Sequence, residues 1–163
     1  MKISTEQLAE RLSTTLGAEA ITADISQRAE YTIDGVTPAL ICTPATADQM
    51  AAAVKICCES SAAIAPCGGR TAMSLGNPLR TYDVSIRTTR LNRLIEHDHA
   101  NLTATVQSGM TLNALQAALA PQKQFVPVDP PLPERTTLGG IIAANLNGPR
   151  RSSYGSVRDL VIG

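Results

Sequence analysis

The sequence predicts an α+β protein whose first portion is of the α/β type, with helices packed on a small sheet. The chain has 163 residues, of which 44% are hydrophobic and only 2% are aromatic. A core with so few aromatic rings must be built from Ala, Val, Ile and Leu, which suits closely packed helices on a sheet. Residues 39–66 also have the pattern strand, helix, strand, and the connection is long enough for a parallel pair with a right-handed crossover.

Each of the longer predicted helices starts at a residue that can cap its first turn. Ser4 and Gln7 have the spacing of a capping box, and Gly17 can end the helix that they begin. Thr46 stands in the same relation to the glutamine three positions on, and it starts the helix between the first two strands. Thr111 can cap a later helix whose leucines recur at helical intervals.

Short apolar or alternating runs predict strands at residues 39–42, 62–66, 82–86 and 102–107. A last apolar run, Leu160–Ile162, is expected to begin another strand. Residues 121–134 hold five of the ten prolines and cannot form regular structure. A short helix near residues 26–30 and a turn at residues 34–35 complete the expected elements.

The composition argues against several classes of protein. The 14 basic and 14 acidic residues balance, so a nucleic-acid partner is not expected. No apolar run approaches the roughly 20 residues that cross a bilayer, and the Glu-bearing start of the chain is unlike a secretory signal. We therefore expect a cytoplasmic protein without a membrane span. Four cysteines without a C-x-x-C pair are expected to be reduced thiols.

The loop at residues 67–76, directly after a predicted strand, is a candidate phosphate site. Gly68 and Gly69 permit close approach of backbone amides to an anion, with Gly69 expected at positive φ, and Thr71 and Ser74 add hydroxyl donors. The loop lacks both the P-loop lysine and the G-x-G-x-x-G spacing, so neither nucleotide motif is supported. An ordinary glycine-rich turn is the alternative.

A second glycine element, residues 136–140, follows the proline-rich segment and opens a short helix. Paired glycines there would let a ligand approach the amides at the positive end of the helix. The alternative is a simple turn with tight helix packing.

Other polar clusters carry weaker indications. The triplet at residues 97–99, His-Asp-His, has no third ligand at suitable spacing, so we expect a solvated turn and no metal. Arg150, Arg151 and Arg158 are expected to form a solvated rim or to pair with carboxylates such as Asp159. No nucleophile with an orienting histidine is apparent.

With both glycine elements placed, the chain resembles the N-terminal part of the FAD-binding domain of the vanillyl-alcohol oxidase type, also called the PCMH type. Within that family it is most similar to the E-type FAD-binding component of glycolate oxidases. The stretches that carry the resemblance are residues 28–34, 38, 43–50, 68–71, 129–131, 137–140, 148–151 and 154–159.

The resemblance implies an N-terminal helical segment at residues 1–37 and an FAD domain at residues 38–163. That domain would have a small parallel βαβ portion, then a portion with an antiparallel sheet and helices. FAD would be held noncovalently, because neither histidine lies near the glycine elements in sequence. The cofactor-binding residues that it implies are Cys67, Gly68, Gly69, Arg70, Thr71, Ser74, Gly76, Pro130, Thr137, Leu138, Gly139, Gly140, Gly148 and Tyr154.

The function implied by the resemblance is hydride removal from a 2-hydroxy acid such as glycolate or D-lactate. Electrons would pass to another subunit or acceptor, so other subunits of a glycolate oxidase-like complex are expected partners. The chain stops where the family continues, so no catalytic residue can be assigned, and we expect weak FAD binding and no turnover by this chain alone. A noncatalytic remnant or interaction subunit is the alternative, and a nicotinamide enzyme is disfavoured by the missing Rossmann spacing.

Overall fold

The computed structural model describes residues 3–163 and divides into two compact units. The first unit combines the chain up to Cys67 with Met73–Arg90, and the second combines Gly68–Ala72 with Leu91–Gly163. The glycine-rich loop therefore belongs to the second unit, although it directly follows a strand of the first.

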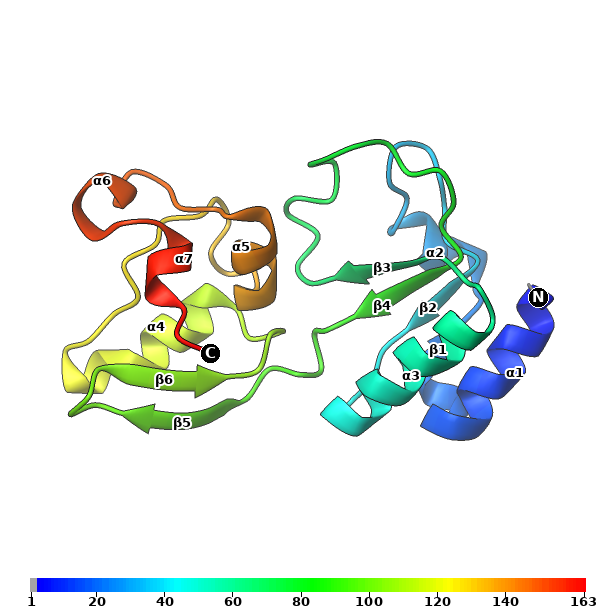
Figure 1. Ribbon diagram of the computed structural model, residues 1–163, viewed down its shortest axis with the longest axis horizontal. Coiled ribbons are helices and arrows are strands. Elements are labelled where there is room, and N and C mark those ends of the chain that lie inside the picture. The colour runs from blue at the N-terminus through cyan, green and yellow to red at the C-terminus, as the bar shows by residue number, and fades with distance from the viewer. Residues whose placement is uncertain (1–2) are drawn as a thin grey trace. The chain divides into compact units, whose positions relative to one another are not determined.

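The first unit contains a four-stranded sheet in the order β1-β2-β4-β3 (Figure 1). Its strands are β1 (Ile21–Thr22), β2 (Leu40–Cys42), β3 (Ile64–Cys67) and β4 (Val84–Arg87). β4 pairs in parallel with both β2 and β3, and β1 is antiparallel to β2. The expected parallel strands are present, but β2 and β3 are not direct neighbours, because the later strand β4 lies between them.

The helices of this unit are α1 (Thr5–Leu16), η1 (Ala18–Ala20), α2 (Ile25–Ala29) and α3 (Ala47–Glu59). The two longer ones, α1 and α3, begin at the expected caps. Ser4 and Gln7 form the complete capping box of α1, and Gly17 ends that helix with φ 96°. The Thr46 side chain accepts a hydrogen bond from the Gln49 amide at the start of α3. These contacts confirm the helix starts predicted from spacing.

The two faces of the sheet carry different cores. Val84 and Ile86 on β4 pack with buried residues of α1 and α3, whereas Ile41 and Cys67 pack with Tyr31. Because successive residues of a strand point to opposite faces, these are the two sides of one sheet. Burial raises the pKa of the Cys42 thiol to about 12, so this cysteine is an inert part of the core.

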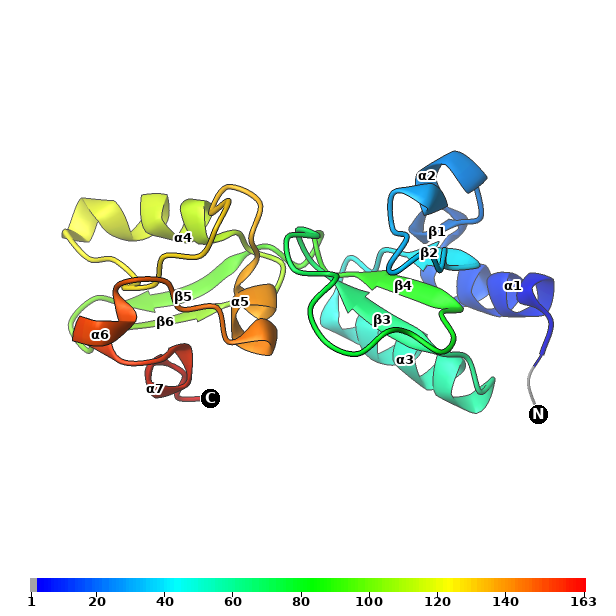
Figure 2. The ribbon, with the colours of Figure 1, turned by 90° about the horizontal axis from the view of Figure 1, so that it is seen from above.

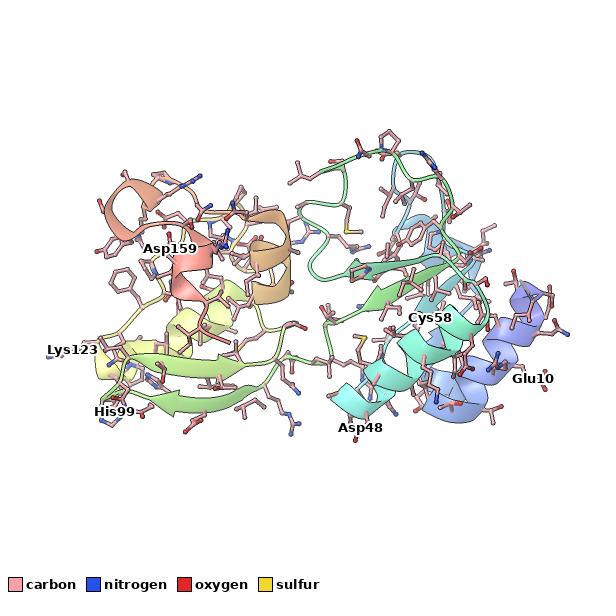
Figure 3. All side chains as sticks on the ribbon, viewed as in Figure 1. Glu10, Asp48, Cys58, His99, Lys123 and Asp159 are labelled. Atoms are coloured by element: carbon pink, nitrogen blue, oxygen red, sulfur yellow. The ribbon has the colours of Figure 1, made fainter. Side chains whose placement is uncertain are left out.

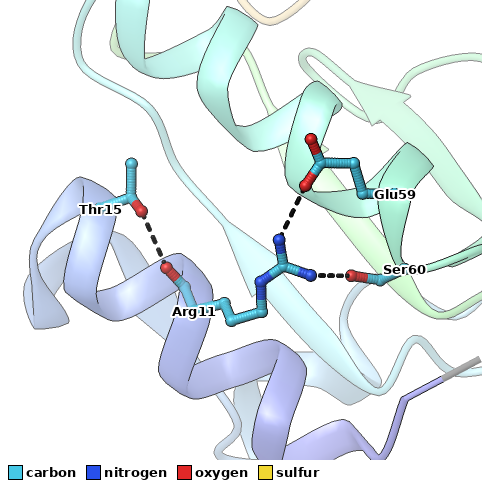
Figure 4. A network of polar contacts seen from close by, with 4 residues as sticks. All are labelled: Arg11, Thr15, Glu59 and Ser60. Atoms are coloured by element: carbon cyan, nitrogen blue, oxygen red, sulfur yellow. Dashed lines mark hydrogen bonds and ion pairs between the residues drawn. The ribbon is translucent and has the colours of Figure 1, made fainter.

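A polar network joins α1 to the end of α3 (Figure 4). The Arg11 guanidinium donates to the Ser60 hydroxyl at 3.1 Å and pairs with the Glu59 carboxylate at 2.8 Å. The Thr15 hydroxyl donates to the Arg11 carbonyl at 3.0 Å. Since Arg11 and Glu59 are both about half exposed, the ion pair itself stabilises the unit little, and its main effect is to fix how the two helices meet.

The second unit is built on an antiparallel hairpin with helices around it (Figures 1 and 2). Its elements are β5 (Leu94–Asp98), β6 (Thr103–Val106), α4 (Leu112–Leu119), η2 (Ala120–Gln122), α5 (Leu138–Ala144), α6 (Arg151–Tyr154) and α7 (Val157–Leu160). α4 lies along the hairpin, and its three buried leucines form a core with Val128, Ile141 and Val157. The antiparallel sheet with helices agrees with the expected second portion.

Two expectations for this unit were wrong. Residues 97–98 lie in strand β5 rather than in a turn, and the turn follows at residues 99–102, where the Asp98 carboxylate accepts from the amides of Ala100 and Asn101. Residues 160–162 do not form a strand, since Leu160 ends α7.

Helix α7 forms because Ser156 and Asp159 make a capping box. The Asp159 carboxylate accepts from both the amide and the hydroxyl of Ser156, and these hydrogen bonds lower the pKa of Asp159. The apolar run at residues 160–162 favours a strand when the sequence is considered alone. The capping box before it instead places Leu160 in a helical turn. Among residues 3–163, no helix is long and apolar enough to cross a membrane.

Candidate functional site

Within the second unit, the glycine-rich loop is fixed against the chain just before α5. The Gly69 carbonyl accepts from Arg135 Nη2 at 3.3 Å. The Thr136 hydroxyl donates to Thr71 Oγ1 at 3.1 Å. The two glycine elements singled out in the sequence, about 65 residues apart, are therefore in direct contact.

Gly68 and Gly69 are glycines because the chains approach closely. A Cβ at Gly69 would overlap the Arg135 carbonyl, and a Cβ at Gly68 would overlap Thr137 Oγ1. Neither glycine has a positive φ, so that expectation for Gly69 was wrong. The left-handed residue of the loop is Arg70, with φ 62°.

The loop presents backbone donors that the described part of the chain does not use. The amides of Gly69 and Thr71 donate to no acceptor within residues 3–163. A left-handed residue between two amides is typical of backbone turns that converge N–H groups on an anion. The exposed guanidinium of Arg135 adds positive charge beside them. This arrangement can bind phosphate.

The amides at the start of α5 do not form the second cradle expected from the sequence. Leu138 donates to the Met110 carbonyl and Gly139 to the Ser108 carbonyl, both at 2.8 Å, and Gly140 donates to Thr137 Oγ1 at 3.3 Å. A Cβ at Gly139 would lie 2.9 Å from the Ser108 carbonyl oxygen. These three amides therefore fit the alternative interpretation of residues 136–140, a tight turn with close helix packing. That residues 137–140 contact a cofactor stays a prediction, and such a contact would have to use atoms other than the amides of residues 138–140.

Asn147 organises the segment after α5, and it was not singled out in the sequence. Its side-chain nitrogen, Nδ2, donates to the Asn145 carbonyl at 2.7 Å. Its side-chain oxygen, Oδ1, accepts from the Val157 backbone amide at 2.5 Å. Its carbonyl accepts from the Asp129 amide. The following Gly148 has φ 72°, and a Cβ there would overlap the Asp129 carbonyl. The adjacent Asn147 and Gly148 form an Asn-Gly pair, which is a strong turn signal and could have identified this turn from the sequence.

Tyr154 and Phe125 form an exposed aromatic pair with ring centroids 5.8 Å apart. The Arg150 guanidinium lies 5.3 Å from the Phe125 centroid and also pairs with the Asp129 carboxylate at 3.1 Å. Arg150 therefore has a carboxylate partner, as expected for this basic run, although the partner is not Asp159.

Most of the remaining predicted residues belong to the first unit. Cys67 is 1% exposed in the core of the first unit, and Ser74 and Gly76 are exposed residues of that same unit. Pro130 is buried in the second unit. Sequence reasoning missed Arg135, which carried no signal beyond being one of the 14 basic residues.

Gln124 contacts both histidine positions at the end of the hairpin. His97 Nε2 is 2.8 Å from Gln124 Oε1, and the Gln124 amide donates to the His99 carbonyl at 2.7 Å. Figure 3 shows His99 and Lys123 at the same end of this unit. No group of three potential metal-binding side chains occurs within residues 3–163.

An apolar groove of about 450 Å³ runs beside α4 in the second unit, and it contains none of the predicted site residues. Its apolar walls include Leu115, Leu119, Phe125, Val126, Leu160 and Ile162.

Comparison with known families identifies the domain. A family model described as an FAD binding domain matches residues 38–163, so the chain belongs to that family. FAD is accordingly its cofactor, and the fold is of the PCMH type.

Several curated proteins are similar to this chain. Glycolate oxidase subunit GlcD of Bacillus subtilis is 30% identical over 164 residues, which cover 98% of this chain and 35% of that protein. D-lactate dehydrogenase of Anaerostipes hadrus is 32% identical over 76% of this chain and 26% of its own length. Glycolate oxidase subunit GlcE of Escherichia coli is 36% identical over 59% and 27% respectively. The chain thus spans between about a quarter and a third of these relatives.

Solved structures share the fold. An alkyldihydroxyacetonephosphate synthase matches with a TM-score of 0.82 at 23% identity, over 97% of this chain and 35% of that one. A p-cresol methylhydroxylase matches with a TM-score of 0.65 at 20% identity, over 76% and 25%.

Proposed function

We propose that this chain is the part of a flavin-dependent oxidoreductase that holds the FAD diphosphate, and that the substrate is a 2-hydroxy acid such as glycolate or D-lactate. The observation that carries the proposal is the fixed loop at residues 68–71, whose Gly69 and Thr71 amides have no acceptor within residues 3–163. The substrate class rests on similarity to proteins named glycolate oxidase subunits and D-lactate dehydrogenase.

The residues of the loop fit a diphosphate. Backbone amides and a guanidinium are the donors that bind phosphate oxygens in proteins, and they bind most strongly when the acceptor is charged. The Gly69 and Thr71 amides would donate to the diphosphate, and Arg135 would balance its charge. When bound, FAD supplies the hydride-accepting chemistry, and the protein supplies its position and electrostatics.

The proposal extends to the setting of the domain. Residues 38–163 form the FAD-binding domain, and residues 1–37 form a segment that precedes it. Similarity to named subunits of glycolate oxidase supports further subunits as partners, to which electrons would pass. We place the protein in the cytoplasm.

The first test is titration of the full chain with FAD, followed by flavin fluorescence. We expect saturable binding that ADP competes with and riboflavin does not, because ADP shares the diphosphate. Arg135→Gln is expected to weaken FAD binding about three- to tenfold, because Arg135 is exposed and its contribution is reduced by solvent. Arg93→Gln is the matched control, since Arg93 is also exposed in the second unit and should leave the affinity unchanged. Competition by riboflavin alone, or equal effects of the two variants, would refute the diphosphate assignment.

We further expect the flavin to be held without a covalent bond. Cys67 is buried in the core of the first unit, and His97 is hydrogen-bonded to Gln124 in the hairpin of the second. Nε2 of His97 is thus engaged, and His99 lies in the turn that follows the same hairpin strand. Acid precipitation of the loaded chain should release all flavin into the supernatant, and a yellow pellet would contradict the prediction.

A further inference from the structure

The Thr136 hydroxyl is buried directly behind the phosphate loop. Thr136 is 1% exposed, and its one hydroxyl proton is shared between the Pro131 carbonyl at 2.6 Å, the shorter contact, and Thr71 Oγ1 at 3.1 Å. We propose that Thr136 is a positioning residue for the cofactor: by donating to Thr71 Oγ1, it leaves the Thr71 hydroxyl proton available to the FAD diphosphate. This inference rests on the proposed function, and in it Thr136 is the residue that orients the Thr71 hydroxyl.

The count of protons supports this role. A threonine hydroxyl has one proton to donate and can accept two hydrogen bonds. The Pro131 carbonyl can only accept, so Thr136 shares its single proton between Pro131 and Thr71. Thr71 Oγ1 is the acceptor of this pair, and its own proton is not used by Thr136.

The backbone around Thr136 fixes the position of this hydroxyl. The Thr136 amide donates to the Leu132 carbonyl at 2.8 Å, and the Thr136 carbonyl accepts from the Leu112 amide at 3.0 Å. Proline restricts the chain at positions 131 and 133. Since Thr136 is almost completely buried, its hydroxyl makes these contacts in place of solvent.

Ligand binding should strengthen the contact. When Thr71 donates to a charged oxygen, its own oxygen becomes a better acceptor, because hydrogen bonds in a chain polarise one another. The effect of Thr136 on affinity should therefore depend on the Thr71 hydroxyl.

A double-mutant cycle on FAD affinity tests the inference in the full chain. We expect Thr71→Val to weaken FAD binding about ten- to hundredfold and Thr136→Val about three- to tenfold. The double variant should bind no more weakly than Thr71→Val, since Thr136 acts through Thr71. Thr136→Ser, which keeps the donor, should bind within about twofold of the unsubstituted chain.

The outcomes separate the inference from the proposed function. Additive effects would show that Thr136 acts independently of Thr71, and they would overturn the inference while leaving FAD binding in place. Failure of the unsubstituted chain to bind FAD would refute both. If Thr136→Val does not fold, Thr136→Ala replaces it in the cycle, because alanine also lacks the hydroxyl donor and adds no volume to the buried site. The effects of the two substitutions on FAD affinity are again expected to be non-additive, and additive effects would contradict the inference.

Discussion

Replacing Gly69 by alanine is expected to reduce FAD affinity at least about tenfold and to destabilise the second unit by about 1–3 kcal/mol, the usual range for overpacking. The added Cβ would overlap the Arg135 carbonyl, a backbone atom with little freedom to move. The amides of both Arg135 and Thr136 donate to the Leu132 carbonyl, at 2.9 and 2.8 Å. The loop must therefore move instead, which breaks its contacts with Arg135 and Thr136.

Gly35→Ala is the matched control for this prediction. It adds the same methyl group at a glycine of the first unit, where nothing lies within 4 Å of the new Cβ. Its φ of 81° makes alanine strained there, so it should cost stability, about 1 kcal/mol, without changing FAD affinity. FAD titration and urea unfolding measure both quantities. Undiminished FAD affinity in Gly69→Ala would show that the observed loop contacts are not needed for binding.

Features determined by neighbouring residues could be predicted from the sequence. Ser4, Thr46 and Thr111 were identified as helix caps, and each accepts the expected amide hydrogen bond, because capping depends on residues three positions apart. The parallel strands were also predicted, because buried strands appear as short apolar runs.

Features determined by distant contacts could not be predicted. Strand β4 lies between β2 and β3, and the sequence of a strand does not indicate which other strands it pairs with. Strand β5 was missed because its two apolar residues are adjacent and are followed by Glu96, His97 and Asp98, so the sequence does not alternate between apolar and polar residues. The reason for glycine at position 69 depends on Arg135, 66 residues later, so sequence alone favoured the wrong cause.

Changing Asn147 to aspartate is expected to destabilise the second unit by about 3 kcal/mol at neutral pH, because it places a charge where a buried donor is required. The Asn147 amide nitrogen faces the Asn145 carbonyl at 2.7 Å and Asn145 Oδ1 at 3.1 Å. Both of these atoms are acceptors, so a carboxylate oxygen at the same place would be repelled. The contact of Asn147 with the Val157 amide would survive, since either side chain can accept it.

The pH dependence of this variant has a defined sign. Burial and two facing acceptors raise the pKa of the new carboxyl group in the folded chain above its value of about 3.9 in the unfolded chain. The loss of stability is therefore complete above the folded-state pKa and diminishes as the pH falls through it toward about 4. Once protonated, the carboxyl group can donate to the Asn145 carbonyl again.

The matched control is Asn145→Asp, the same chemical change two positions earlier. Asn145 is exposed, and its side-chain oxygen already accepts the hydrogen bond from Asn147, so a carboxylate there keeps an acceptor where one is needed. Urea unfolding between pH 4 and pH 8, compared at each pH with the unsubstituted chain, should show a large loss for Asn147→Asp that shrinks toward acid, and little change for Asn145→Asp. If both variants lost the same stability at every pH, the assignment of the Asn147 side-chain amide as a buried donor to Asn145 would be wrong.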